Sequence, residues 1–343
     1  MVDQAKNNVK SLKALKDNGH KIGKLKFKRE VKSVNLKETG KDYRVDRNKS
    51  AIKIAKVPGW MHVKGVEQLF DTPERELANA HLVKKPSGYY LQVTTYVPRE
   101  YVREHDDFIL GTVLGIDMGI STNITCSDGV KFSVWVPEPK RLKRIQRKLA
   151  KNRRAGHKGS KNHEKLRQKQ LRCYEKMDNL KDNAANQIVH ELMRNEVVYF
   201  QDENLGAWKV RFGKVVHHSI MGRVKTRLLR HPRAIMLKKY VPTTGWCDPC
   251  QTKTKHELSQ RTFVCGNCGR TADRDVHAAG NMAIMGQNPD NVDTLEGKIV
   301  PTERGEQAGT QVASQKPVVA RPSVPCVLRH LKDGKGLRVV LSL

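Results

Sequence analysis

Residues 113–117, with the sequence VLGID, form an apolar run that ends in a carboxylate and predict a buried strand with an acidic last residue. Val197–Phe200 is a second apolar run, closely followed by Glu203, and Ala234–Leu237 is a third. Strands of this kind, separated by helical segments, predict an α/β fold with a mixed sheet.

Two more strands and a tight turn follow the first run. Asn123–Cys126 and Val130–Val134 flank Asp128-Gly129, and an Asp-Gly pair between strand-like runs is a strong hairpin signal. Gly88–Val97 precedes them and is rich in aromatic and β-branched residues, which predicts another strand.

Apolar residues at three- and four-residue steps mark the helices. They recur from Leu166 to Leu192, which predicts a long helix with one packed stripe, and more briefly over residues 142–149. Residues 219–231 and an Ala-rich segment from Asp275 to Gly286 predict two further helices. In the basic, polar first 55 residues we expect a weak helix and then an extended segment at Lys24–Arg29.

Positive charge dominates the chain, because 65 Lys and Arg residues stand against 35 Asp and Glu. A surface field of that sign predicts a polyanionic partner. The density is greatest from Lys140 to Arg172, where 15 of 33 residues are basic and Glu164 is the only acid. A solvated charged helix explains many such runs, but this excess favours binding to the backbone of RNA or a heteroduplex. The expected contacts are Lys140, Arg141, Lys143, Arg144, Arg147, Lys148, Lys151, Arg153, Arg154, Lys158 and Lys161.

Hydropathy and cysteine spacing indicate the cellular compartment in which the protein is expected. No apolar run approaches the roughly 18 residues that a spanning helix needs, and no signal-peptide core follows Met1, so a membrane partner is not expected. Four of the seven cysteines fall in two close pairs, which favours metal binding in a reducing compartment. We expect a soluble, cytoplasmic protein.

Two CxxC pairs, Cys247 with Cys250 and Cys265 with Cys268, are separated by a 14-residue spacer. This spacing is typical of a zinc ribbon, in which each pair supplies two thiolates of a tetrahedral site. Four thiolates leave no open position, so we expect a structural zinc rather than a catalytic one. Chance pairing and a redox dithiol are the alternatives.

Three acids occupy the ends of predicted elements: Asp117 ends a strand, Glu203 follows another, and Asp275 opens a helix. In a mixed sheet, strand ends and an adjoining helix start can meet at one edge. Carboxylates gathered there repel unless cations neutralise them, and oxygen ligands suit Mg²⁺ or Mn²⁺. Because two such ions can promote phosphodiester hydrolysis, the predicted reaction class is nucleic-acid hydrolysis. Taken singly, each acid also has an ordinary explanation, as a turn former, a solvated strand end or a helix cap.

Several motifs occur together in the order seen in one known family. They are GIDMG at residues 115–119, Gly159–Asn162 ahead of the long helix, Glu203-Asn204-Leu205, the paired CxxC, and DRDVHAAGN at residues 273–281. In this arrangement the chain resembles the TnpB proteins of OrfB-type insertion sequences, which are related to compact type V CRISPR effectors and to Fanzor proteins. The resemblance covers roughly residues 85–306.

The resemblance implies a RuvC/RNase H-like mixed sheet with flanking helices, an inserted zinc ribbon and a partial β-rich, wedge-like N-terminal domain. It implies that Asp117, Glu203 and Asp275 bind magnesium and catalyse cleavage, with a guide RNA and target DNA as partners in the nucleoid of a prokaryotic host. The expected regions are a partial recognition region at 1–110, the nuclease domain at 111–245 with basic helices at 140–195, the ribbon at 246–270, the last acidic motif and helix at 271–290, and a disordered tail at 291–343.

Two features depart from the family pattern. The metal-binding aspartate of the family is followed two residues later by Asn, whereas here His277 follows Asp275. The chain also begins close to what resembles the end of the family's recognition module, at Lys24–Arg29, so we expect a truncated or split member.

Two other functions stay open. A basic remnant or regulator that binds RNA and DNA without cleaving them fits the shortened N-terminus, whereas the trio of acids argues against it. A DDE-type transposase shares three acids, although a zinc ribbon just before the last acid suits the TnpB pattern better.

Overall fold

The computed structural model describes residues 2–23, 31–98, 108–156, 159–239, 241–255, 257, 260–292, 319–321 and 338–342. It divides into one unit of residues 1–106 with 311–331 and a second unit of residues 107–310 with 332–343. The expected extended segment at Lys24–Arg29, the expected contact Lys158 and most of the predicted tail lie outside the described residues. The domain boundaries predicted from the sequence stay predictions.

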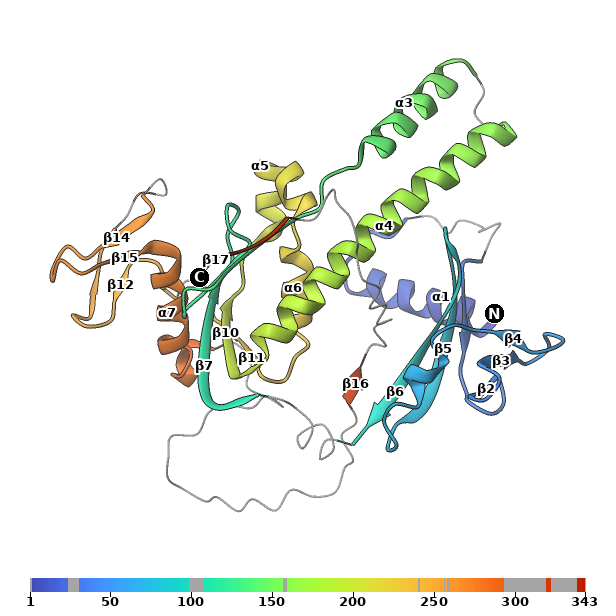
Figure 1. Cartoon of the computed structure of the whole chain (residues 1–343), viewed down its shortest axis with the longest axis horizontal. Coiled ribbons are helices and arrows are strands. Elements are labelled where there is room, and N and C mark those ends of the chain that lie inside the picture. The colour runs from blue at the N-terminus through green and yellow to red at the C-terminus, as the bar shows by residue number, and fades with distance from the viewer. Residues whose placement is uncertain are drawn as a thin grey trace. The chain divides into compact units, whose positions relative to one another are not determined.

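The first unit combines one helix with two small antiparallel sheets (Figure 1). The larger sheet has the order β1-β5-β6-β16 and the smaller one β2-β3-β4. Buried residues such as Tyr43, Ile52 and Val93 form their common core. The predicted strand at Gly88–Val97 is confirmed as β6. The elements are α1 (Val2–Asp17), β1 (Ser33–Leu36), β2 (Tyr43–Asp46), β3 (Ala51–Ile54), β4 (Met61–His62), the 3-10 helix η1 (Val66–Leu69), β5 (Glu76–Lys85), β6 (Gly88–Val97) and β16 (Val319–Arg321).

The second unit is built on a six-stranded mixed sheet, as the sequence predicts. Its order is β11-β10-β7-β8-β9-β17, in which β7, β10 and β11 run parallel to one another and the remaining neighbours are antiparallel. The predicted hairpin is confirmed, with Gly129 in its turn at a φ of 91°. The strands are β7 (Ile109–Asp117), β8 (Ile124–Cys126), β9 (Lys131–Trp135), β10 (Asn195–Gln201), β11 (Ala234–Leu237) and β17 (Arg338–Ser342).

Helices cover both faces of this sheet. Along β10, Val198 and Phe200 belong to a core with α4 and α6, whereas Val197 and Tyr199 pack with Met282 of α7 on the other face. Figure 1 shows α3 and the first half of α4 extending beyond the sheet as a helical hairpin. The helices are α3 (Lys140–Arg154), α4 (Lys161–Leu192), α5 (Leu205–His218), α6 (Met221–Leu228), α7 (Arg274–Met285) and the 3-10 helix η2 (Pro289–Asn291).

Helix α5 is absent from the sequence-based expectation. None of its residues is buried, and Phe212 has non-helical angles that kink it, so it carries no continuous apolar stripe. Ser160 and Asn204 illustrate how the sequence starts the helices, because each side chain accepts a backbone N–H in the first turn of the helix that follows. Within the described residues, no helix is both long and apolar enough to cross a membrane.

Gly115 lets α7 lie directly against β7. A Cβ atom at Gly115 would be only 1.8 Å from the carbonyl oxygen of Ala279 and 2.6 Å from the backbone nitrogen of Ala283. Any other residue here would force the helix off the strand. This close approach places the start of α7 next to the end of β7, where Asp117 lies.

Two short hairpins lie between β11 and α7 and carry the cysteine pairs. They are formed by β12 (Trp246–Cys247) with β13 (Thr252–Lys253) and by β14 (Thr262–Val264) with β15 (Thr271–Asp273). Cys247, Phe263 and Cys265 form a small core of their own, so this ribbon has little apolar packing beyond its cysteines.

Candidate metal centres and nucleic-acid interface

Two of the three acids lie at the carboxyl ends of neighbouring parallel strands. Asp117 is the last residue of β7, and Glu203 follows two residues after the end of β10. The register pairs Ile116 with Phe200, so the two strands end side by side. This is the edge of an α/β sheet where functional groups usually gather.

The third acid lies in the first turn of α7. Asp273 is the N-cap of this helix, because its Oδ1 accepts the backbone N–H groups of Asp275 and Val276, each at 3.0 Å. The cap therefore falls on Asp273, which leaves the Asp275 carboxylate available for other partners. Asp273 Oδ2 also accepts a hydrogen bond from Lys131 Nζ of β9 at 2.8 Å. This contact fixes the start of the helix to the sheet.

The charges of Asp275 and Glu203 act on Asp117. Burial of Asp117, together with these two negative charges, raises its pKa to about 7, against a lowering effect of Arg274. The three carboxylates are nevertheless more widely spaced than the four cysteines. Among the described residues, the cysteines are the group whose potential ligand atoms all lie within 4.8 Å of one another. The acids thus share one electrostatic environment at a wider spacing.

Two arginines compensate the charge of Asp275. The Arg274 Nε and Nη2 atoms donate to Asp275 Oδ1 at 3.1 and 2.9 Å, and Arg261 Nη1 lies 3.8 Å from Oδ2. Arg261 also donates to the Ser121 hydroxyl at 3.0 Å, so it joins the ribbon to the loop after β7. Sequence reasoning missed both arginines: Arg274 is the immediate neighbour of Asp275 and gave no separate signal, whereas the role of Arg261 depends on contacts that only the folded chain creates.

Lys225 of α6 holds the second acid in place. Its ammonium donates to the backbone carbonyl of Glu203 at 2.7 Å and pairs with the Asp202 carboxylate. Burial raises the pKa of Glu203, and the positive charge of Lys225 opposes this rise. Lys225 is a third functional candidate that sequence reasoning missed.

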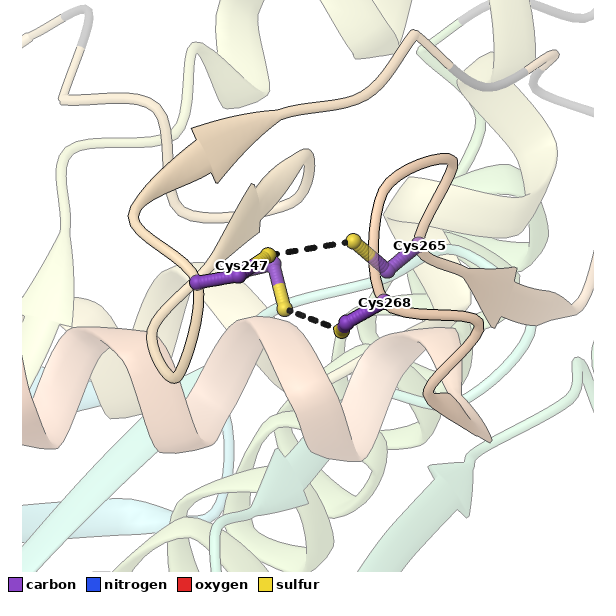
Figure 2. A group of neighbouring side chains, drawn as sticks. Cys247, Cys265 and Cys268 are labelled. Carbon is purple, nitrogen blue, oxygen red and sulfur yellow. Dashed lines mark hydrogen bonds between the residues drawn. The ribbon is translucent and has the colours of Figure 1, made fainter.

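The four cysteines converge as the spacing predicts. In Figure 2 the side chains labelled Cys247, Cys265 and Cys268 lie on facing loops, with their sulfur atoms turned towards one another. The Sγ atoms of Cys247 and Cys268 are 3.6 Å apart, and those of Cys250 and Cys265 are 3.4 Å apart. A tetrahedral zinc with ~2.3 Å Zn–S bonds requires S···S separations of about 3.8 Å. The donor set and its spacing therefore fit zinc.

One thiol of each CxxC pair, Cys250 and Cys265, is prepared for ionisation. Backbone N–H groups of Cys268 and Asn267 lower the pKa of the Cys265 thiol to about 5, and a hydrogen bond with Thr252 lowers the pKa of Cys250. Thiolates are the form that binds metals, so these two ligands need little further stabilisation.

The predicted basic contacts lie on α3 and at the start of α4. Leu142, Ile145 and Leu149 form the buried stripe of α3, whereas its nine Lys and Arg side chains are exposed. Lys161 is also exposed, and with Lys165, Lys169 and Arg172 it lines an open groove along the first turns of α4. Such an array suits a phosphate backbone rather than base edges.

Two family models match parts of this chain. The OrfB_IS605 model, described as "Probable transposase", matches residues 97–197, and "Cas12f1-like, TNB domain" matches residues 232–282. A "Putative RNA-guided DNA endonuclease" of Streptomyces pristinaespiralis is 26% identical over 224 residues, which are 62% of this chain and 54% of that protein. The chain thus spans about half the length of this curated relative.

Fold and sites together define an α/β protein with a four-cysteine ribbon inserted between its mixed sheet and its last long helix. The first matched region covers the sheet's leading strands and the basic helices, and the second covers the ribbon and most of α7. With the Streptomyces relative, these matches support the assignment of the chain as a TnpB-family protein, as its motifs predict.

Proposed function

We propose that this chain is an RNA-guided DNA endonuclease whose catalytic domain is of the RuvC/RNase H-like type. The observation that carries the proposal is the effect of the Asp275 and Glu203 charges on buried Asp117, whose pKa they help to raise at one edge of the mixed sheet. A protein that only binds nucleic acid gains nothing from negative charge gathered beside phosphates. The matched family models and the name of the Streptomyces relative point in the same direction.

The sheet supports the RuvC-like assignment. An antiparallel meander, β7-β8-β9, is joined through β7 to the parallel strands β10 and β11. The acids lie at the ends of the two strands at this junction and at the start of the helix packed on them. We propose that the nuclease domain consists of residues 111–245 and 271–290, interrupted by the ribbon at 246–270.

Oxygen-only ligands that repel one another suit Mg²⁺ or Mn²⁺. When bound, such cations supply a nucleophilic water and stabilise the leaving oxygen of a phosphodiester. The protein's part is to fix the three carboxylates: β7 and β10 position Asp117 and Glu203, while the Asp273 cap and Arg274 orient Asp275. Lys225 holds the Glu203 backbone, which keeps the second carboxylate at the strand end.

The partners follow from the charge distribution. We propose that the exposed cations of α3 and α4 bind the backbone of a guide RNA or of its heteroduplex with target DNA, while base pairing supplies the sequence specificity. The cysteine ribbon is proposed to bind one structural zinc ion. The predicted partial recognition region at residues 1–110 remains part of this proposal.

A cleavage assay with the full chain, its co-purified RNA and Mg²⁺ tests the function. Wild type is expected to cut DNA matched to that RNA, and Asp117→Ala is expected to lose at least a hundredfold in rate because a carboxylate ligand is removed. Asp128→Ala, in the β8–β9 turn, is the matched control and should cut normally. Equal cutting by wild type and Asp117→Ala contradicts the proposal. RNA and DNA binding without cutting favours the regulator, and strand-joined products favour the DDE-type transposase.

A further inference from the structure

We propose that His277 is a positioning residue that couples the cysteine ribbon to Asp275, so that the zinc site governs the geometry of the acidic site. This inference rests on the proposed function only for the identity of the acids. The coupling itself follows from the contacts of His277 with the ribbon and from its place on α7, the helix that also carries Asp275.

The His277 side chain faces the ribbon rather than the acids. It is buried, its ring stacks on Phe263 with centroids 3.7 Å apart and planes inclined by 22°, and its Nε2 lies 2.7 Å from the backbone carbonyl oxygen of Trp246. In a helix, positions 275 and 277 point to nearly opposite sides, since each residue turns the chain by about 100°. One face of α7 therefore presents Asp275 while the other is attached to the ribbon.

Both attachment points belong to residues that the cysteines hold. Trp246 directly precedes the ligand Cys247, and Phe263 is fully buried against Cys247 and Cys265. The hairpins have strands of only two and three residues, and such short pairs are marginally stable alone. Their arrangement, and hence the position of both attachment points, depends on a metal held by the four thiolates.

The hydrogen bonds around Trp246 place a donor at His277. Asn281, one turn further along α7, donates its two amide protons to the carbonyls of Thr243 and Trp246, at 2.6 and 2.8 Å, and its Nδ2 also lies 3.2 Å from His277 Nε2. The Trp246 carbonyl is an acceptor, so His277 Nε2 carries the proton that it receives. The same ring also stacks on Phe263, so His277 contacts the ribbon in two ways.

Three substitutions separate the two contacts. His277→Asn keeps a donor and loses the stack, His277→Phe keeps a stacking ring and loses the donor, and His277→Ala loses both. His190→Ala, an exposed histidine near the end of α4, is the matched control. All are made in the full chain, and zinc content is measured for each.

The first readout is hydrogen exchange of the backbone amides in the first turn of α7, which does not depend on nuclease activity. Removing zinc from wild type with a chelator should speed exchange there at least tenfold. His277→Ala should do the same while it retains zinc, and His277→Asn should restore protection to within about threefold of wild type. Unchanged exchange in zinc-loaded His277→Ala and His277→Phe overturns the coupling, and so does loss of zinc in either variant.

The second readout is Mn²⁺ affinity, measured by electron paramagnetic resonance with Asp117→Ala as the reference for a disabled acidic site. His277→Ala should weaken Mn²⁺ binding roughly tenfold or more, as supporting partners of metal ligands commonly do, and His190→Ala should not. If wild type and Asp117→Ala bind Mn²⁺ equally while exchange still reports coupling, the proposed function fails and the coupling stands. If Mn²⁺ affinity depends on Asp117 but not on His277, the control of the acidic site by the ribbon is refuted.

Discussion

At the scale of single residues, Asp117 is a carboxylate in a buried position that disfavours its charged form. Its usual pKa is 3.8, and burial together with Asp275 and Glu203 raises it to about 7. Groups with pKa values perturbed in this way are frequent at functional sites, where they cost stability that the rest of the fold provides.

Asp117→Asn is expected to stabilise the metal-free protein at high pH. Because the folded-state pKa is raised, the unfolded chain loses its proton near pH 4 and the folded chain only near pH 7, so the free energy of unfolding falls between these values. The substitution should add on the order of 2–4 kcal/mol at pH 8 and progressively less towards pH 4. Urea unfolding at both pH values measures this difference.

Asp128→Asn, in the exposed turn between β8 and β9, controls for a general loss of negative charge and should show no such pH dependence. Adding Mn²⁺ at pH 8 should stabilise wild type but not Asp117→Asn. A variant that is no more stable than wild type at pH 8 would show that Asp117 lies in a less unfavourable environment.

At the scale of elements, the packing of α7 on β7 brings the third acid to the sheet. Gly115 permits this packing, and the Asp273 cap with its Lys131 partner fixes the first turn of the helix. The contacts of Gly115 and Lys131 join segments 164 and 142 residues apart. The positions of the acids therefore depend on a few backbone approaches more than on local sequence.

Gly115→Ala is expected to lower stability by roughly 1–3 kcal/mol or more, because the new methyl group overlaps the Ala279 carbonyl. Thermal unfolding measures the effect. Gly280→Ala, in α7 itself, is the matched control: a Cβ there meets nothing within 4 Å, so the variant should be as stable as wild type or slightly more so. If both substitutions had the same effect, the close approach of β7 and α7 would not be the cause.

The ribbon is a second element with a testable dependence. We expect one zinc per chain, loss of that zinc in Cys265→Ser, and retention in Cys173→Ser, whose half-buried thiol lies on α4 away from the ribbon. Elemental analysis of the purified variants measures the metal. Zinc retained by Cys265→Ser would argue against a four-thiolate site.

The sequence predicts the elements that have strong local signals. β7, β10, β11 and the long helix α4 carry apolar runs or stripes, and the two CxxC pairs identify their own site. The short strands of the first unit, the longer β5 and the kinked α5 have no such signal and are not predicted. The positions of the strand ends predict the three acids at one edge, whereas Arg261 and Lys225 depend on tertiary contacts that no local pattern encodes.

At the scale of the whole molecule, the chain carries a net charge of +30, and α3 presents nine exposed Lys and Arg side chains to the solvent. Among the described residues, none of the cations of α3 pairs with a carboxylate, so they remain available to an external polyanion. Binding through such groups releases counterions and therefore weakens with salt.

Replacing Arg144, Arg147, Lys148 and Lys151 with alanine should reduce the slope of log K against log salt for RNA binding by roughly 3, about 0.7–0.9 for each lost contact. Fluorescence anisotropy over a salt series measures it. The matched control replaces Lys209, Arg211, Lys214 and Arg230, exposed cations outside the proposed binding surfaces, and removes the same charge. Equal losses in both variants would mean that net charge, rather than the α3 surface, determines affinity.

The packing of α7 against β7 also has a consequence for the growing polypeptide. The strand that carries the first acid is synthesised about 160 residues before the helix that carries the last one, and α7 is the last long helix of the described chain. A ribosome-bound intermediate can form the β8–β9 hairpin and the α3–α4 pair, yet it lacks the third carboxylate until residue 285 has left the exit tunnel. The order of synthesis therefore means that the three acids can come together only after most of the chain has been made.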